Sequence, residues 1–323
     1  MLERPFEQNI IAIIWDFDKT LINGYMQEPI FKKYGISGID FWKEVNNLKE
    51  KYADMGVLVN KDTIYLNHIL TCVEQGIFEG LNNQTLLDLG GELTFYNGIP
   101  DIFESLNNSV KSNPDFQKYK IDIEHYVVST GLAQMIRGSQ IAKYVQGIWG
   151  CEFIEDPIKS SLNIKEYCPK DKVEPRKSIS QIGYAIDNTS KTRAIFEINK
   201  GSNQYPEIDV NSHIDWDVRR IPFTNMIYIA DGPSDVPVFS ILQHYHGSTY
   251  AVYPKGNQSG FRQVDQLRKD KRVDAFGEAD YSNGTTTYMW IHEHVNQIGC
   301  SICQRKETAI RGSVSKPPRH INE

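Results

Sequence analysis

The sequence predicts an α/β protein built on a doubly wound parallel sheet, with a small α-helical domain inserted into it. Three short apolar segments, 10–15, 126–129 and 226–230, are typical of strands buried on both faces, as in parallel sheets covered by helices. Each segment stops at polar or glycine-containing sequence. Because such sheets bind ligands outside the carboxyl ends of their strands, we expect three distant stretches of the chain to meet in one cleft.

The stretch between the first two strands has a different spacing of apolar residues. Residues 24–93 carry apolar side chains at helical spacing, among them Phe41, Val45 and Leu48, and are expected to form the inserted helical domain. The α/β core is therefore assigned to residues 1–23 and 94–303. The chain returns to it near Tyr96, and Pro100 can open the next helix.

The second half of the core contains one insertion and one tail. Residues 155–187 are polar, contain prolines and end in an alternating segment, so we expect a hairpin or flap there. A helix is expected from Lys191 to about Lys200 and Gly201. Residues 304–323 are basic and poor in apolar side chains, which predicts a disordered tail.

Composition narrows the class of protein. The chain has 323 residues, 40% of them hydrophobic and 24% charged, as in ordinary soluble globular proteins, and its net charge of -6 argues against a nucleic-acid partner. The N-terminus lacks the features of a secretory signal, and the apolar run 10–15 is too short to span a bilayer. We expect a cytoplasmic protein without a membrane span, while export without a classical signal stays open.

The cysteines give little information about function. There are five, scattered and odd in number, which argues against a disulfide framework. Cys300 and Cys303 form a CxxC, but without a second pair this is half of a zinc site. We interpret them as two reduced thiols at a helix end, and any further role stays open.

The strongest chemical signal is Asp16-Phe-Asp18-Lys-Thr20, directly after the first apolar segment. Side chains alternate along an extended strand, so Asp16 and Asp18 point to the same side. Two adjacent carboxylates repel each other and need a proton or a hard cation such as Mg²⁺. One could then attack phosphorus while the other handles the leaving-group proton, with Thr20 holding the geometry. The alternative for this motif alone is a turn capped by two aspartates.

Three further segments carry polar groups suited to the same cleft. Asp231-Gly-Pro-Ser-Asp235 follows the third apolar segment and offers a metal ligand and a supporting carboxylate. Ser129-Thr130-Gly131 follows the second and exposes backbone N–H groups for phosphate oxygens. Lys191 lies at a predicted helix start, where a cation opposes the helix dipole, so an anionic partner is expected.

These motifs occur in the order Asp-x-Asp-x-Thr, Ser, Lys and Asp-x-x-x-Asp. With them the chain resembles the haloacid dehalogenase superfamily, and most closely its phosphoserine-phosphatase-like branch, whose helical cap is inserted after the first motif. The resemblance spans about residues 10 to 255. It implies a Rossmann-like core, a cap at 24–93, and an Mg²⁺-dependent phosphatase that forms an aspartyl-phosphate.

The resemblance also implies a role for each matching residue. Asp16 is the implied nucleophile and Asp18 the general acid and base. Lys191 is the implied catalytic lysine, and Lys200 is the fallback because Lys191 lies farther ahead of Asp231 than in compact relatives. The implied metal ligands are Asp16, Asp18 and Asp231, supported by Asp235, and the implied phosphate-binding residues are Ser129, Thr130, Gly131 and Thr20.

The chain departs from the family's pattern at three positions. Lys19 stands where the family often has glycine, Ala230 where many members have glycine, and Thr130 where the branch commonly has the first of two glycines. None of these removes a catalytic group. The presence of Asp18 favours phosphate-ester chemistry over C–halogen or C–P cleavage, because the family members that break those bonds lack the second aspartate.

The substrate is not identified by the sequence. Side chains expected to face it are Asn23, Tyr25, Gln27, Phe31 and Trp42, although any one of the aromatic residues could equally be part of the cap's own core. A small phosphorylated metabolite is the first hypothesis. A protein phosphatase acting on a phosphopeptide, a phosphotransferase of the same superfamily, and a catalytically weak binding module are the alternatives.

Overall fold

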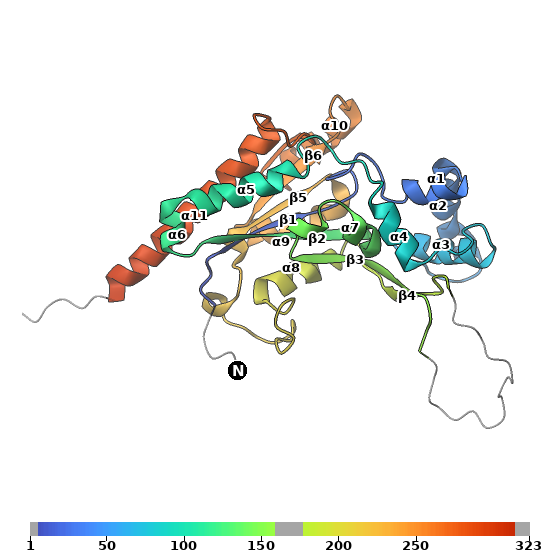
Figure 1. Ribbon diagram of the computed structural model, residues 1–323, viewed down its shortest axis with the longest axis horizontal. Coiled ribbons are helices and arrows are strands. Elements are labelled where there is room, and N and C mark those ends of the chain that lie inside the picture. The colour runs from blue at the N-terminus through green and yellow to red at the C-terminus, as the bar shows by residue number, and fades with distance from the viewer. Residues whose placement is uncertain (1–5, 159–176, 314–323) are drawn as a thin grey trace, which may run out of the picture.

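The computed structural model describes residues 6–158 and 177–313. In this part of the chain a seven-stranded sheet lies at the centre, with helices on both faces (Figure 1). The strands are β1 (Ile10–Trp15), β2 (Asp122–Leu132), β3 (Gly147–Ile154), β4 (Gln181–Tyr184), β5 (Met226–Ala230), β6 (Ser248–Tyr253) and β7 (Ala275–Glu278). The predicted α/β class with a doubly wound, mainly parallel sheet is confirmed.

The sheet order is β4-β3-β2-β1-β5-β6-β7. All neighbouring strands are parallel except β3 and β4, which are antiparallel. The three strands expected from the sequence correspond to β1, part of β2, and β5, which lie side by side at the middle. The order therefore reverses at β1, and the carboxyl ends of these three strands adjoin, which is where doubly wound sheets bind ligands.

Burial explains why these segments form strands. Residues Ile11–Trp15 and Met226–Ala230 are completely buried, because helices cover both faces of the sheet. A continuous apolar run is the pattern that such two-sided burial requires. The helices of these layers are α5 (Asp101–Ser112), α6 (Pro114–Lys118), α7 (Ala133–Gly138), α8 (Lys191–Lys200), α9 (Val236–His244), α10 (Gln258–Lys269) and α11 (Thr286–Ser313).

Four helices lie between β1 and the return of the chain at Tyr96. They are α1 (Glu28–Tyr34), α2 (Gly38–Asp54), α3 (Ile64–Glu74) and α4 (Asn83–Gly90), at one end of the sheet in Figure 1. Local signals explain where two of them begin: the Ser37 hydroxyl accepts the N–H of Asp40 at 3.2 Å, and the Asn82 side chain accepts that of Thr85 at 2.7 Å. That residues 24–93 form a cap domain of their own stays a prediction.

Helix α4 joins these helices to the core by a close glycine contact. A Cβ on Gly90 would lie 2.1 Å from the Met135 carbonyl oxygen, and one on Gly138 would lie 1.7 Å from that of Leu87. Neither position can hold a side chain without moving the backbone, so α4 and α7 pack against each other only because both residues are glycine.

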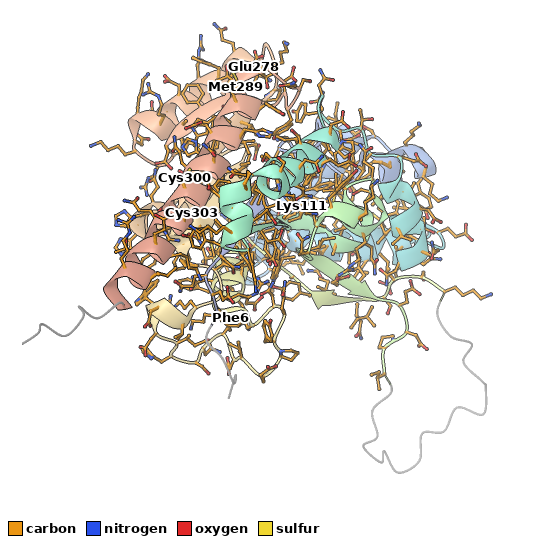
Figure 2. All side chains as sticks on the ribbon, turned by 60° about the vertical axis from the view of Figure 1, so that its left-hand side comes forward. Phe6, Lys111, Glu278, Met289, Cys300 and Cys303 are labelled. Carbon is orange, nitrogen blue, oxygen red and sulfur yellow. The ribbon has the colours of Figure 1, made fainter. Side chains whose placement is uncertain are left out.

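Two expectations need correction, and a third is met only in part. Helix α11 continues to Ser313, so residues 304–313 are helical rather than disordered. Cys300 and Cys303 lie within α11 and not at its end (Figure 2). The β3–β4 pair is antiparallel, as in the expected hairpin at 155–187, but residues 159–176 lie outside the described part of the chain.

Membrane insertion of a helix has no support in the structure. Within residues 6–158 and 177–313, every helix is too short or too polar to cross a bilayer.

Candidate active site

The site forms where the carboxyl ends of β2, β1 and β5 adjoin. Asp16 directly follows β1, and its backbone N–H donates to the Ile229 carbonyl on β5 at 2.9 Å. The hydrogen bonds between β1 and β5 therefore fix the backbone of Asp16. Asp231 directly follows β5, and Lys191 begins α8. The structure thus brings together side chains that are more than 200 residues apart in the sequence.

A buried lysine joins two of the carboxylates. The Nζ atom of Lys191 donates to Asp16 Oδ1 at 2.7 Å and to Asp235 Oδ1 at 2.6 Å. Lys191 is 1% exposed, Asp16 5% and Asp235 0%, so this ion pair is shielded from water. Burial alone would lower the pKa of Lys191, but the charges of Asp16 and Asp235 outweigh burial and raise it, so the ammonium group stays charged.

Of the two lysines considered for the catalytic role, the structure places only Lys191 beside Asp16. The Nζ atom of Lys200 instead donates to the carbonyl oxygens of Val210 at 2.6 Å and Ser212 at 2.7 Å. Lys200 therefore holds the loop that follows its helix.

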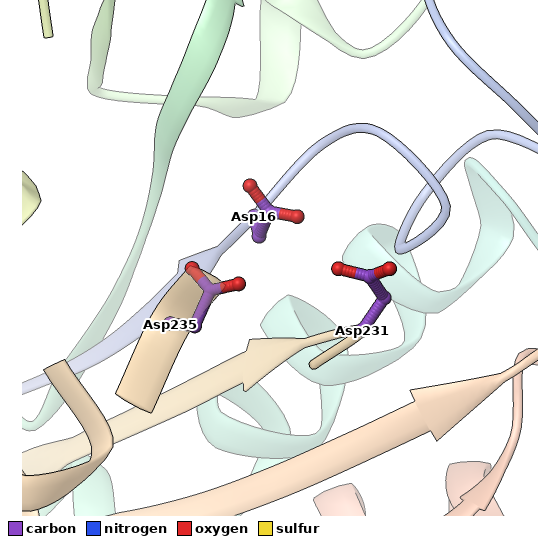
Figure 3. Close-up of side chains that lie close together, drawn as sticks. All are labelled: Asp16, Asp231 and Asp235. Atoms are coloured by element: carbon purple, nitrogen blue, oxygen red, sulfur yellow. The ribbon is translucent and has the colours of Figure 1, made fainter. Parts of the chain in front are cut away.

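The carboxylates form an acidic cluster (Figure 3). One oxygen from each of Asp16, Asp231 and Asp235 lies within 4.8 Å of the others. The donor set consists of oxygen atoms, which fits a hard cation such as Mg²⁺. Asp235 is already occupied, because Tyr228 donates to its Oδ1 at 2.6 Å and Ser234 to its Oδ2 at 2.8 Å. Together with the bond from Lys191, these bonds favour a supporting role for Asp235, whereas Asp16 accepts one hydrogen bond on each oxygen, from Lys191 and from Thr20.

Burial, and next to it repulsion between the carboxylates, raises the pKa values of three aspartates at the site. Burial, and then the Coulombic effect of Asp16, raises the pKa of Asp18 to about 8. Burial and the charges of Asp16 and Asp235 raise the pKa of Asp231 to about 7. Burial also raises the pKa of Asp16 to about 6, against the opposing charge of Lys191. A divalent cation among these side chains would relieve the repulsion, so the residues fit the implied Mg²⁺.

Asp18 and Thr20 are fixed by the loop after β1. The backbone N–H of Met26 donates to Asp18 Oδ1 at 3.0 Å, and the Thr20 hydroxyl donates to Asp16 Oδ2 at 3.1 Å. The Tyr281 hydroxyl in turn donates to the Thr20 carbonyl at 2.6 Å. Thr20 is buried and contacts Asp16, so its position fits orientation of that carboxylate better than direct contact with a ligand.

Ser129, Thr130 and Gly131 lie where β2 leaves the ladder. The register with β3 shifts between Val128 and Leu132, so the backbone of these three residues is not committed to regular pairing with β3. Thr130 and Gly131 line the cavity, whereas Ser129 is buried behind them and its Oγ accepts the Gly131 N–H at 3.0 Å. A Cβ on Gly131 would lie 2.2 Å from the Met26 Cε, so a side chain here would require the Met26 side chain to move.

A cavity of about 280 Å³ opens in front of these groups. Asp16, Asp18, Asp231 and Lys191 line it. Further lining residues come from the segment that contains α1–α3, namely Tyr25, Gln27, Trp42, Lys61 and Tyr65.

Three of the five side chains expected to face the substrate line this cavity, namely Tyr25, Gln27 and Trp42. Phe31 is buried against Phe41, with ring centroids 4.7 Å apart, and Asn23 accepts a hydrogen bond from Tyr96 at 3.3 Å. Within the described residues, Gln27 Oε1 and Trp42 Nε1 are buried without a hydrogen-bond partner.

Sequence reasoning missed two tyrosines at the site. Tyr228 lies in β5, where it passed for a core residue, and Tyr65 donates from α3 to the Thr130 carbonyl at 2.7 Å. The available signal was a hydroxyl in an otherwise apolar strand or helix, because a buried tyrosine O–H usually finds a partner. Which partner it finds depends on the fold and not on the neighbouring sequence.

Comparison with known proteins adds one relative and several similar structures, while no protein-family model matches the chain. A Borreliella burgdorferi protein described as uncharacterized is 40% identical over 292 residues, which are 89% of this chain and 97% of that protein. Similar solved structures include a haloacid dehalogenase family hydrolase from Salmonella enterica serovar Typhi, with 14% identity and a TM-score of 0.46 over 84% of this chain and 68% of the other.

Two further structures are a phosphoserine phosphatase in a form that mimics its phospho-aspartyl intermediate (14% identity, TM-score 0.45, 83% and 93% of the two chains) and a gene product from Archaeoglobus fulgidus (15%, 0.47, 95% and 88%). By its identity over nearly the whole of both sequences, the chain belongs to one family with the Borreliella burgdorferi protein.

Proposed function

We propose that this chain is an Mg²⁺-dependent phosphatase of the haloacid dehalogenase superfamily that hydrolyses a small phosphomonoester through an aspartyl-phosphate on Asp16. The observation that carries the proposal is the pairing of two unlike carboxyl groups at one cavity. Asp16 is held by Lys191 at 2.7 Å, whereas Asp18 has its pKa raised to about 8 by burial and by the charge of Asp16. One group is thus suited to attack, and the other to donate a proton at neutral pH.

In the first step, a carboxylate oxygen of Asp16 forms a bond to phosphorus as the bond to the leaving-group oxygen breaks. Asp18 gives its proton to that oxygen, so the alcohol departs neutral. Lys191 stays bonded to Asp16 and balances the charge at the base of the cavity. Thr130 and Gly131 line the cavity and would contact the phosphoryl oxygens, although the Gly131 N–H donates to Ser129 Oγ in this structure.

In the second step, Asp18 is a carboxylate and takes a proton from water as the water oxygen bonds to phosphorus. The bond between phosphorus and the Asp16 oxygen breaks, which releases phosphate and restores both side chains. Asp16, Asp231 and the backbone carbonyl of Asp18 would hold the Mg²⁺. When bound, the ion supplies positive charge that offsets the charge of the phosphate and the carboxylates.

The cavity supports a small substrate. A volume of about 280 Å³ accommodates a phosphate and a short leaving group. The unpartnered Gln27 Oε1 and Trp42 Nε1 lie in residues of its wall, which favours a polar leaving group.

The test is hydrolysis of p-nitrophenyl phosphate by the wild type and by Asp16→Asn, with Mg²⁺ and after chelation. We expect metal-dependent release of p-nitrophenol by the wild type and none by the variant, whose circular dichroism should be unchanged. The matched control is Asp54→Asn, the same change at the exposed end of α2, which should keep wild-type activity. Near-normal turnover by Asp16→Asn, or turnover that survives thorough chelation, would contradict the proposal.

A further inference from the structure

Lys19, which the proposed mechanism does not use, has an unfavourable backbone conformation. Its φ is +57°, in the left-handed region that glycine adopts freely and that lysine rarely adopts. Four other non-glycine residues in the described ranges have a positive φ, but none of them lines the catalytic cavity as Lys19 does. Backbone strain kept at a ligand cavity is a reason to ask what the side chain does there.

The side chain of Lys19 is held against the cavity wall by Tyr25. Its Nζ donates to the Tyr25 hydroxyl at 2.7 Å and lies 4.1 Å from the centre of that ring. An ammonium group has three donors, and the tyrosine takes one of them. In the described part of the chain Lys19 has no ion pair, in contrast to Lys191, which has two. Lys19 therefore brings an unpaired positive charge to the cavity.

The partner of this charge is not one of the phosphoryl-binding groups. Lys19 Nζ is bonded to Tyr25, a lining residue that comes from the segment before α1 and not from the ends of β1, β2 or β5. Lys19 is also within electrostatic reach of the catalytic acids, because its charge opposes the rise in the pKa of Asp231 that burial and Asp16 cause. Outside the catalytic groups, the other charged side chains of the lining are Lys61 and Asp62, whose formal charges sum to zero.

We propose that Lys19 and Tyr25 form a leaving-group subsite, and that the substrate's leaving group carries an anionic oxygen group, a carboxylate or a second phosphate. The inference rests on the proposed phosphatase function and adds the substrate class. A charge-assisted hydrogen bond from Lys19, together with the Tyr25 hydroxyl, would recognise such a group. A neutral leaving group of the same size would leave the ammonium without an anionic acceptor.

The first experiment measures binding and does not depend on turnover. Asp16→Asn protein in Mg²⁺ buffer is titrated calorimetrically with ethyl phosphate, 2-phosphoglycolate and ethylene glycol bisphosphate, which differ in the group at the end of a two-carbon chain. We expect at least one of the two anionic esters to bind tenfold or more tightly than ethyl phosphate, and their order identifies carboxylate or phosphate as the preferred group. Adding Lys19→Met should abolish the preference. Equal affinities for all three esters would overturn the proposal.

The second experiment compares kcat/KM for the same esters in otherwise wild-type protein. In Lys19→Met and Lys19→Gly, the ratio of the preferred anionic ester to ethyl phosphate should fall at least tenfold, mainly through KM, whereas Lys19→Arg should retain most of it. Lys19→Gly should melt no lower than the wild type, because glycine relieves the backbone strain. The matched control is Lys33→Met, since Lys33 also lies over a tyrosine ring, at 5.9 Å from Tyr34, but outside the cavity.

The outcomes separate the two proposals. A loss of turnover that is equal for all esters in Lys19→Met would show that Lys19 serves the phosphoryl group and would overturn the subsite. The same holds if Lys61→Met, and not Lys19→Met, removes the preference. Wild-type protein that binds the anionic ester selectively but hydrolyses no ester would refute the phosphatase function and leave the subsite standing.

Discussion

Replacing Asp18 with asparagine separates the charge of this side chain from its shape. An asparagine oxygen can still accept the N–H of Met26, which bonds to Asp18 Oδ1 at 3.0 Å. What disappears is the titratable carboxyl group, whose pKa burial and the charge of Asp16 raise from 3.8 to about 8. The variant should lose phosphatase turnover by on the order of 10² to 10⁴, because the proton donor is gone.

The same variant should be more stable than the metal-free wild type. A carboxyl group whose pKa is raised by folding contributes most to stability below about pH 4, and this contribution is lost as the pH rises to about 8. At pH 7 the pH lies about three units above the unfolded pKa of 3.8. The wild type should therefore have lost roughly 4 kcal/mol of unfolding free energy, at ~1.36 kcal/mol per unit. The asparagine side chain cannot titrate, so the advantage of the variant should be small at pH 4, grow with pH and level off above pH 8.

The assay is thermal or denaturant unfolding of both proteins in EDTA at half-unit steps from pH 4.5 to 9. Asp187→Asn is the control of opposite sign. Hydrogen bonds from the backbone N–H of Ser190, and from its hydroxyl, lower the pKa of Asp187, so its charge stabilises the fold above the unfolded pKa. That variant should be less stable than the wild type at neutral pH, with a deficit that shrinks in acid. If Asp18→Asn followed the wild-type stability curve at every pH, the reasoning about this buried carboxyl would be wrong.

Three further predictions concern the groups around Asp16. Lys191→Met should be inactive and lose on the order of 3 to 5 kcal/mol in unfolding free energy, since Asp16 and Asp235 lose their cation. Lys200→Met should keep its turnover of p-nitrophenyl phosphate, and the opposite result would exchange the roles of the two lysines. Added Mg²⁺ should raise the melting temperature more at pH 8 than at pH 5, because Asp16 and Asp231, with pKa values raised to about 6 and 7 mainly by burial, hold protons at pH 5; a shift independent of pH would remove these two carboxylates from the metal site. Tyr65→Phe should lower kcat/KM by roughly a factor of ten, through loss of its 2.7 Å bond to the Thr130 carbonyl, at a cost of about 1 kcal/mol in stability; unchanged kinetics would show that this bond does not position the phosphate loop.

The apolar pattern of the sequence predicted the central strands of the sheet but not all of the outer ones. Strands β1 and β5 are uninterrupted apolar runs because helices cover both of their faces, and such burial leaves a readable pattern. Strand β3 and the edge strand β7 contain glycine between their apolar residues, and their burial is incomplete. A half-buried strand of this kind resembles a loop in sequence, because its partners and not its own residues hold it.

Composition misled the assignment of residues 304–313 for a related reason. That stretch is charged and poor in apolar residues, yet it continues α11, whose earlier turns bury Ile291, Val295, Ile298 and Ile302. Extending an existing helix adds one hydrogen bond per residue without the cost of a new nucleus, so a polar segment can stay helical when a packed segment precedes it. The helical state of residues 304–313 therefore depends on the packed turns before them and not on their own composition.

The lysine shows where sequence reasoning about the site succeeds and where it stops. A cation in the first turn of a helix opposes the helix dipole, so the position of Lys191 required an anionic partner, and Asp16 and Asp235 are that partner. The choice between Lys191 and Lys200 could not follow from the same rule, because it depends on the register of α8 against the sheet. Asp187 sets that register: its Oδ1 accepts the backbone N–H groups of Thr189 at 3.0 Å and Ser190 at 2.7 Å, which fixes the turn that delivers Lys191. Spacing along the chain says nothing about such a turn, so the motif can predict the chemistry while the loop before the helix decides which residue performs it.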